Sequence, residues 1–140
     1  LVLAGVDLGY MLSDVVAESH WYRGNWEFRT ALFGGEQYRP ETAYLVGLDP
    51  FLRYTFATGT RWVPFFEAGA GVTATDIGPP DLGGTFQFNL QSGVGSHLFL
   101  TRHTAATVSY RFLHLSNAGL TTPNLGANAH VVSLGFTWFF

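Results

Sequence analysis

Large apolar side chains alternate with small or polar ones along most of this chain, and turn-rich segments interrupt the alternation. In residues 44–56, for example, Val46 and Leu48 alternate with Gly47 and Asp49. Successive side chains of a strand point to opposite faces, so this period predicts strands with one apolar and one polar face. Seven stretches follow the pattern: residues 2–12, 25–33, 44–56, 62–74, 85–100, 105–116 and 130–140. No linker separates them, and we expect a single domain over residues 1–140.

The two faces of these strands admit two kinds of barrel. A soluble barrel turns its apolar face inward around an apolar ligand, whereas a membrane barrel turns it toward lipid. The polar faces mix both signs of charge with Gln, Asn and Gly, at Asp7, Glu27, Arg29, Asp49, Arg53, Glu67 and Arg111. This mixture suits a narrow lumen filled with ion pairs, because a water-facing exterior would carry more lysine than this sequence has. We therefore predict an all-β, antiparallel, up-and-down transmembrane barrel and keep the soluble barrel as the alternative.

Composition strengthens the membrane interpretation. Hydrophobic residues make up 47% of the chain and charged residues only 12%, whereas soluble domains carry about 25% charged residues. The apolar faces end in Trp, Tyr and Phe, as the interfacial girdles of membrane barrels do. No run approaches the ~20 apolar residues of a membrane-spanning helix. We expect no nucleic-acid partner, because the net charge is −3 and no basic run is present.

The strand count and the metal-binding potential each lead to one expectation. Single-chain bacterial barrels usually have an even number of strands, so seven stretches imply a strand before Leu1 or one overlooked at residues 13–22. We favour a strand before Leu1. The chain has no cysteine, and His20, His103 and His130 lack ligand spacing with carboxylates. We therefore expect no metal site.

A small polar cluster at one strand end is the candidate for chemistry. His114 and Ser116 share the parity of Tyr110 and Phe112, so they continue the outward face. Asn128 can lie across the following hairpin from His114. A Ser, His and Asn arrangement on the outside of a barrel can be reached by an acyl chain. The same residues can also be merely a polar strand end near the lipid headgroups.

The residues from Pro64 to Phe140 resemble the PagL-type lipid A 3-O-deacylases, also known as acyloxyacyl hydrolases, which are eight-stranded outer-membrane barrels. The resemblance rests on PFFEAGAGV from Pro64, on LGGTFQF from Leu82 through the following GVG, and above all on HLSNAGLTTPN from His114. It implies that Ser116 is the nucleophile and His114 its general base. It also implies an oxyanion site and an acyl-chain contact, formed by Asn117 with the backbone N–H of Gly119, and by Phe88. Asn117 and Gly119 can equally be turn residues, and Phe88 ordinary lipid-facing surface.

One residue departs from the family pattern. Asn128 stands where the family's characterised members carry a glutamate as the third triad residue, and an Asn shared with other members would make the change a subfamily trait. A carboxylate orients the imidazole and stabilises its charged form, and an Asn in a serine protease triad lowers turnover by about four orders of magnitude. An Asn does serve in Cys-His-Asn enzymes.

The resulting prediction is a bacterial outer-membrane serine esterase. It acts on an ester-linked acyl chain of lipid A or another membrane lipid through Ser116, His114 and Asn128, and it needs no cofactor. The alternative is a catalytically silent structural or self-assembling barrel, which Asn128 favours. An oligomer is compatible with both.

Overall fold

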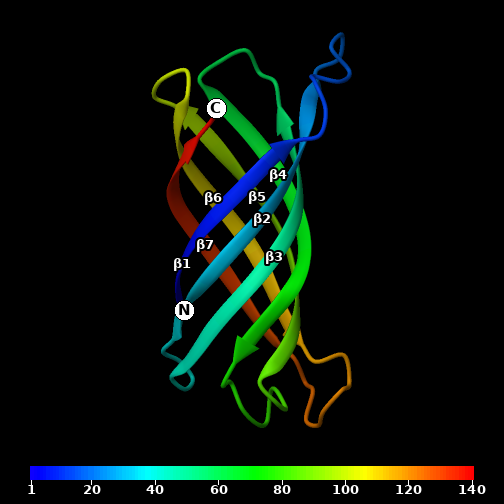
Figure 1. Cartoon of the computed structure of the whole chain (residues 1–140), viewed down its shortest axis with the longest axis vertical. Helices are drawn as coiled ribbons and strands as arrows, with labels where there is room; N and C mark the ends of the chain where they lie inside the picture. The colour runs from blue at the N-terminus through cyan, green and yellow to red at the C-terminus, as the bar shows by residue number, and fades with distance from the viewer.

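The computed structural model describes residues 1–140 as one curled sheet of seven antiparallel strands. Each strand pairs with its neighbours in sequence, and the edges are the first and the last strand. Figure 1 shows the strands running obliquely to the long axis of a half-barrel. The strands are β1 (Val2–Met11), β2 (Gly24–Gln37), β3 (Ala43–Phe56), β4 (Trp62–Thr75), β5 (Phe86–Phe99), β6 (Thr104–Ser116) and β7 (Ala127–Trp138). The structure contains no helix that is long and apolar enough to cross a membrane.

The apolar faces of the strands point outward, as the alternation predicts. On β3, Leu48 is 47% exposed, whereas the adjacent Asp49 is 0% exposed. The same contrast holds on β5, where Leu90 is exposed and Gln91 is buried. The interior is thus polar and the outer surface apolar, which is the arrangement of a membrane barrel. The soluble alternative with an apolar interior is wrong.

Two strand limits differ from the expected stretches by three residues or more, and one segment that could have held a further strand does not. β2 continues to Gln37 instead of ending at Phe33, because Gly34 and Gly35 interrupt the side-chain alternation while their backbone still pairs with β1 and β3. β7 begins at Ala127 instead of His130, because residues 127–129 continue the ladder with β6. Residues 13–22 contain no strand, only the isolated bridge from Val16 to Gly24. Residues 13–22 therefore do not supply an eighth strand. The alternative, a strand before Leu1, stays a prediction.

A network of ion pairs fills the middle of the lumen around Glu67. Its Oε2 lies 2.5 Å from Nη1 of Arg29 and 2.9 Å from Nη2 of Arg53, and its Oε1 lies 2.7 Å from Nε of Arg111. Arg29 also pairs with Asp7, and Arg53 with Glu27 at 3.5 Å. Because a buried charge is stable only when it is paired, this network allows the barrel to have a charged interior.

His97 is an interior histidine, as its parity predicts. Its side chain is buried between Nη1 of Arg53 at 3.2 Å and Oγ1 of Thr107 at 2.8 Å. At the end of the barrel that carries the loop between β6 and β7, the interior becomes apolar. The buried residues there are Ala43, Leu45, Ile77, Leu82, Leu113 and Leu115. The candidate site therefore lies on the outside of a wall whose inner side is apolar.

Candidate active site

The register of three neighbouring strands assembles the candidate residues on the outer face. Phe88 of β5 pairs with Ser116 of β6. In the next row, Leu90 pairs with His114, and His114 pairs with Asn128 of β7. Phe88, Ser116, His114 and Asn128 therefore occupy two adjacent rows of one surface.

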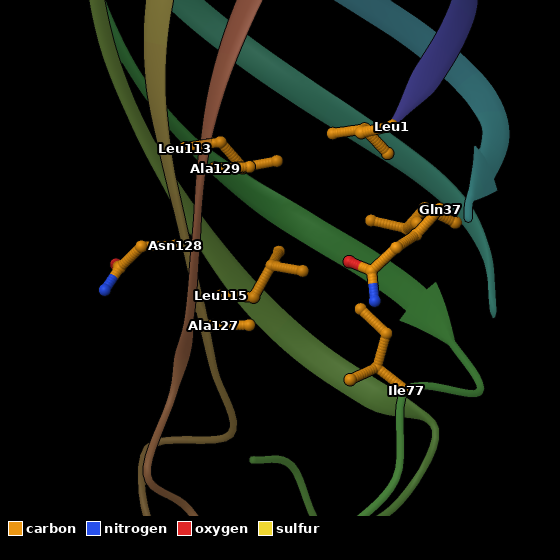
Figure 2. A pocket seen from close by; sticks show the side chains of 9 residues that line it. Leu1, Gln37, Ile77, Leu113, Leu115, Ala127, Asn128 and Ala129 are labelled. Atoms are coloured by element: carbon orange, nitrogen blue, oxygen red, sulfur yellow. The ribbon is translucent and has the colours of Figure 1, made fainter. Parts of the chain in front are cut away.

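His114 and Asn128 are joined directly. Nδ1 of the imidazole lies 2.7 Å from Oδ1 of the Asn128 amide. An amide oxygen only accepts hydrogen bonds, so Nδ1 of His114 carries the proton and donates it. In a neutral imidazole, Nε2 then presents a lone pair, which is the form that a general base requires. Figure 2 shows the Asn128 side chain directed away from the interior side chains of Leu113 and Leu115.

Ser116 is the last residue of β6 and is partly exposed. No hydrogen bond joins its Oγ to His114 in this structure, although both side chains lie on one face. Catalytic hydrogen bonds commonly tighten only when substrate binds. The two residues therefore remain a candidate nucleophile and base.

Gly126 provides the space that the imidazole occupies. A Cβ at this position would lie 3.0 Å from Cε1 and 3.7 Å from Nε2 of His114. The β6–β7 ladder ends with Leu115 opposite Ala127, so Gly126 comes next, beside Ser116. The Nε2 edge of the ring thus faces the row of Ser116. Periodicity did not identify Gly126, and the only sequence signal for it is the turn composition of PNLG.

Asn117 and Gly119 lie in the loop that connects β6 to β7, and they are bonded to each other. The backbone N–H of Gly119 donates to Oδ1 of Asn117 at 2.9 Å. The side chain of Asn117 is 0% exposed and donates to the carbonyl of Gly83 at 2.9 Å and to Oγ1 of Thr121 at 2.8 Å. In this state, Asn117 ties its own loop to the loop before β5. Its role as an oxyanion ligand stays a prediction.

The shape of this loop also depends on residues that the sequence did not single out. Oδ1 of Asn124 accepts the backbone N–H of Asn117 at 2.9 Å. Ala118 and Gly119 both adopt positive φ, at 54° and 82°, and for Gly119 this agrees with the alternative that it is a turn residue. The backbone immediately after Ser116 is therefore held by two side-chain acceptors, Oδ1 of Asn124 for the N–H of Asn117 and Oδ1 of Asn117 for the N–H of Gly119.

Phe88 forms an apolar wall beside Ser116. It is 40% exposed and packs edge-to-face against Phe86, with ring centroids 5.2 Å apart. It lies directly across the ladder from Ser116, where an acyl chain at the serine would meet it, and its role as an acyl-chain contact stays a prediction.

Comparisons with known proteins agree with this arrangement. A family model described as lipid A 3-O-deacylase (PagL) matches residues 4–137. Lipid A deacylase PagL of Pseudomonas aeruginosa is 38% identical over 84 residues, which are 58% of this chain and 46% of that protein. The match therefore spans about half the length of this relative.

Two further matches cover more of the chain. Lipid A deacylase PagL of Bordetella bronchiseptica is 29% identical over 133 residues, which are 87% of this chain and 69% of that protein. The crystal structure of the outer membrane enzyme PagL superposes with a TM-score of 0.64 at 25% identity. This superposition covers 98% of this chain and 89% of that one.

Proposed function

Because the chain belongs to the PagL family of lipid A 3-O-deacylases, we propose that it is an esterase that hydrolyses an ester-linked acyl chain of lipid A. Like its solved relative, it is an outer-membrane barrel. The observation that carries the proposal is the 2.7 Å bond from Nδ1 of His114 to Asn128, with Ser116 on the same lipid-facing surface. A deacylase site on the outside of an outer-membrane barrel is in direct contact with the acyl chains of the surrounding lipids.

In the proposed reaction, Oγ of Ser116 attacks the carbonyl carbon of the ester, and Nε2 of His114 takes the hydroxyl proton. The bond from the carbonyl carbon to the sugar oxygen then breaks, and His114 returns the proton to that oxygen. Water, activated by the same nitrogen, releases the fatty acid from the acylated serine. A direct attack by water uses the same base and gives the same products. Neither route requires a metal or an organic cofactor.

Asn128 supports only part of what a carboxylate does in this position. Its amide oxygen orients the ring and places the proton on Nδ1. It brings no negative charge, so the imidazolium that forms during the reaction is stabilised less than beside a glutamate. We therefore expect slower turnover than a glutamate at this position would give.

The proposed oxyanion site uses the backbone N–H of Gly119, positioned by Asn117. That N–H already donates to Asn117, so the substrate oxygen must replace Oδ1 of Asn117 as its acceptor. The buried side chain of Asn117 keeps its bonds to Gly83 and Thr121 meanwhile. In this role Asn117 positions the loop and leaves the oxyanion contact to the backbone.

The second candidate function is a structural barrel without turnover, which the replacement of the family's glutamate by Asn128 favours. Deacylation of purified lipid A, followed by mass spectrometry, distinguishes the two. The proteins to compare are the natural chain, Ser116→Ala, and Ser92→Ala as a control with the same change on β5. We expect fatty-acid release by the natural chain and the control, and none by Ser116→Ala. Release that persists in Ser116→Ala would exclude the serine mechanism, and no release by the natural chain would favour the structural barrel.

A further inference from the structure

A second polar pair lies on the outer surface beside the candidate site. Oη of Tyr110 lies 2.6 Å from Nδ1 of His130, and the two rings are stacked with centroids 5.8 Å apart. Phe112 contacts the same imidazole, with centroids 5.6 Å apart. Phe112 pairs with His130 across the β6–β7 ladder, one row from His114 and Asn128. The pair therefore lies one row beyond the proposed base and two rows from Ser116, on the same lipid-facing surface.

Counting protons shows that this pair has an unused hydrogen-bond donor. A neutral phenol and a neutral imidazole together carry one O–H and one N–H. Their mutual bond uses one of these protons, whichever residue donates it. Within residues 1–140, no other side-chain or backbone group is hydrogen-bonded to either side chain, so one donor stays without a partner there. A polar group in the hydrocarbon region is costly unless it is bonded.

The depth of the pair limits what can accept this bond. His130 comes three residues after the start of β7 at Ala127, which is about 10 Å along a tilted strand. Both residues are exposed among apolar neighbours such as Val132. Just below the headgroups, the uncharged acceptors of a lipid are the ester and amide carbonyls of its acyl groups.

We propose that Tyr110 and His130 form a binding subsite that donates a hydrogen bond to an acyl carbonyl that is not cleaved. That another carbonyl of the same lipid is cleaved at Ser116 rests on the proposed function, whereas the donor subsite itself does not. The row of Phe112 and His130 is four residues along β6 from Ser116, which is about 14 Å. The subsite thus selects lipids with a second acyl carbonyl about that far from the cleaved ester, which means lipids with several acyl chains.

A binding experiment tests the subsite without any turnover. The probes are a 2,3-diamino-2,3-dideoxyglucose lipid with both acyl chains amide-linked, and its alkyl analogue without carbonyls, in detergent micelles. We expect the natural chain to bind the amide lipid about fivefold more tightly than the analogue, the effect of one neutral hydrogen bond. The double variant Tyr110→Phe with His130→Phe should lose this preference while keeping the stacked rings. Tyr44→Phe, the same change on β3, should retain it.

The outcomes separate the subsite from the proposed function. Equal binding of the two probes by the natural chain overturns the subsite, as does a preference that survives in the double variant. If the natural chain cleaves lipid A, the KM of the double variant for lipid A should be about fivefold higher, with a small change in kcat. A lack of cleavage by the natural chain contradicts the proposed function and leaves the binding result to decide the subsite. Each variant is checked for folding by comparing the electrophoretic mobility of heated and unheated samples, because a folded barrel migrates differently from the unfolded chain.

Discussion

Nδ1 of His114 lies 2.7 Å from Oδ1 of Asn128, across the last ladder of the sheet. A neutral amide thus occupies the position that the family resemblance assigns to a carboxylate. It selects the tautomer in which Nε2 is free to accept a proton. For the proposed base, the amide therefore supplies the orientation of the imidazole and lacks only the charge beside it.

The first prediction concerns that missing charge. Replacing Asn128→Glu should raise kcat for lipid A at least about tenfold, because a carboxylate stabilises the imidazolium in addition to orienting the ring. Asn128→Gln has the same length without the charge and serves as the matched control. Initial rates of fatty-acid release measure both. Equal rates for the two variants would show that charge at this position does not limit turnover.

The second prediction concerns the space at Gly126. A methyl group there would lie 3.0 Å from Cε1 of His114, so Gly126→Ala should displace the imidazole and lower kcat at least about tenfold. Gly126 also has a φ of +81°, so backbone strain must be separated from crowding. Gly59→Ala supplies that control, because Gly59 has a φ of +73° in a turn remote from β7. An unchanged kcat in Gly126→Ala would mean that the ring position is not critical.

The third prediction concerns the apolar wall beside Ser116. Phe88→Ala should raise KM for lipid A severalfold and flatten the dependence of rate on acyl-chain length, because the chain loses its contact surface. Phe28→Ala makes the same truncation on the lipid-facing side of β2 and should have neither effect. A series of synthetic esters of increasing chain length provides the measurement. Identical chain-length profiles in the two variants would make Phe88 ordinary lipid-facing surface.

The fourth prediction concerns stability. Glu67→Gln removes the one carboxylate that contacts three arginines, so buried positive charge is left in excess. The free energy of unfolding should fall by about 3–5 kcal/mol, as measured by urea titration in lipid vesicles with tryptophan fluorescence. Glu36→Gln changes an exposed residue of β2 and should be nearly neutral. If both variants lost equal stability, the network would not be a stabilising element.

Much of the architecture follows from the sequence alone because strand periodicity is a local property. Side chains two residues apart share a face whatever the strand pairs with, so the alternation around Leu48 and Asp49 determines which face meets lipid. The same rule places His114 and Ser116 on one surface. The ends of β2 and β7 were less predictable, since glycine and short polar segments join a ladder through backbone bonds that carry no side-chain pattern.

The contacts that give these surfaces their chemistry are long-range. Register decides that Phe88 lies opposite Ser116, and it also aligns β6 with β7 so that Tyr110 and His130 meet. Asn117 is next to the proposed nucleophile in sequence, yet its side chain is held by Gly83, 34 residues away. Periodicity determines which way each side chain points. Only the paired strands and folded loops determine which side chains come within hydrogen-bond distance, because those distances depend on segments that are far apart in the chain.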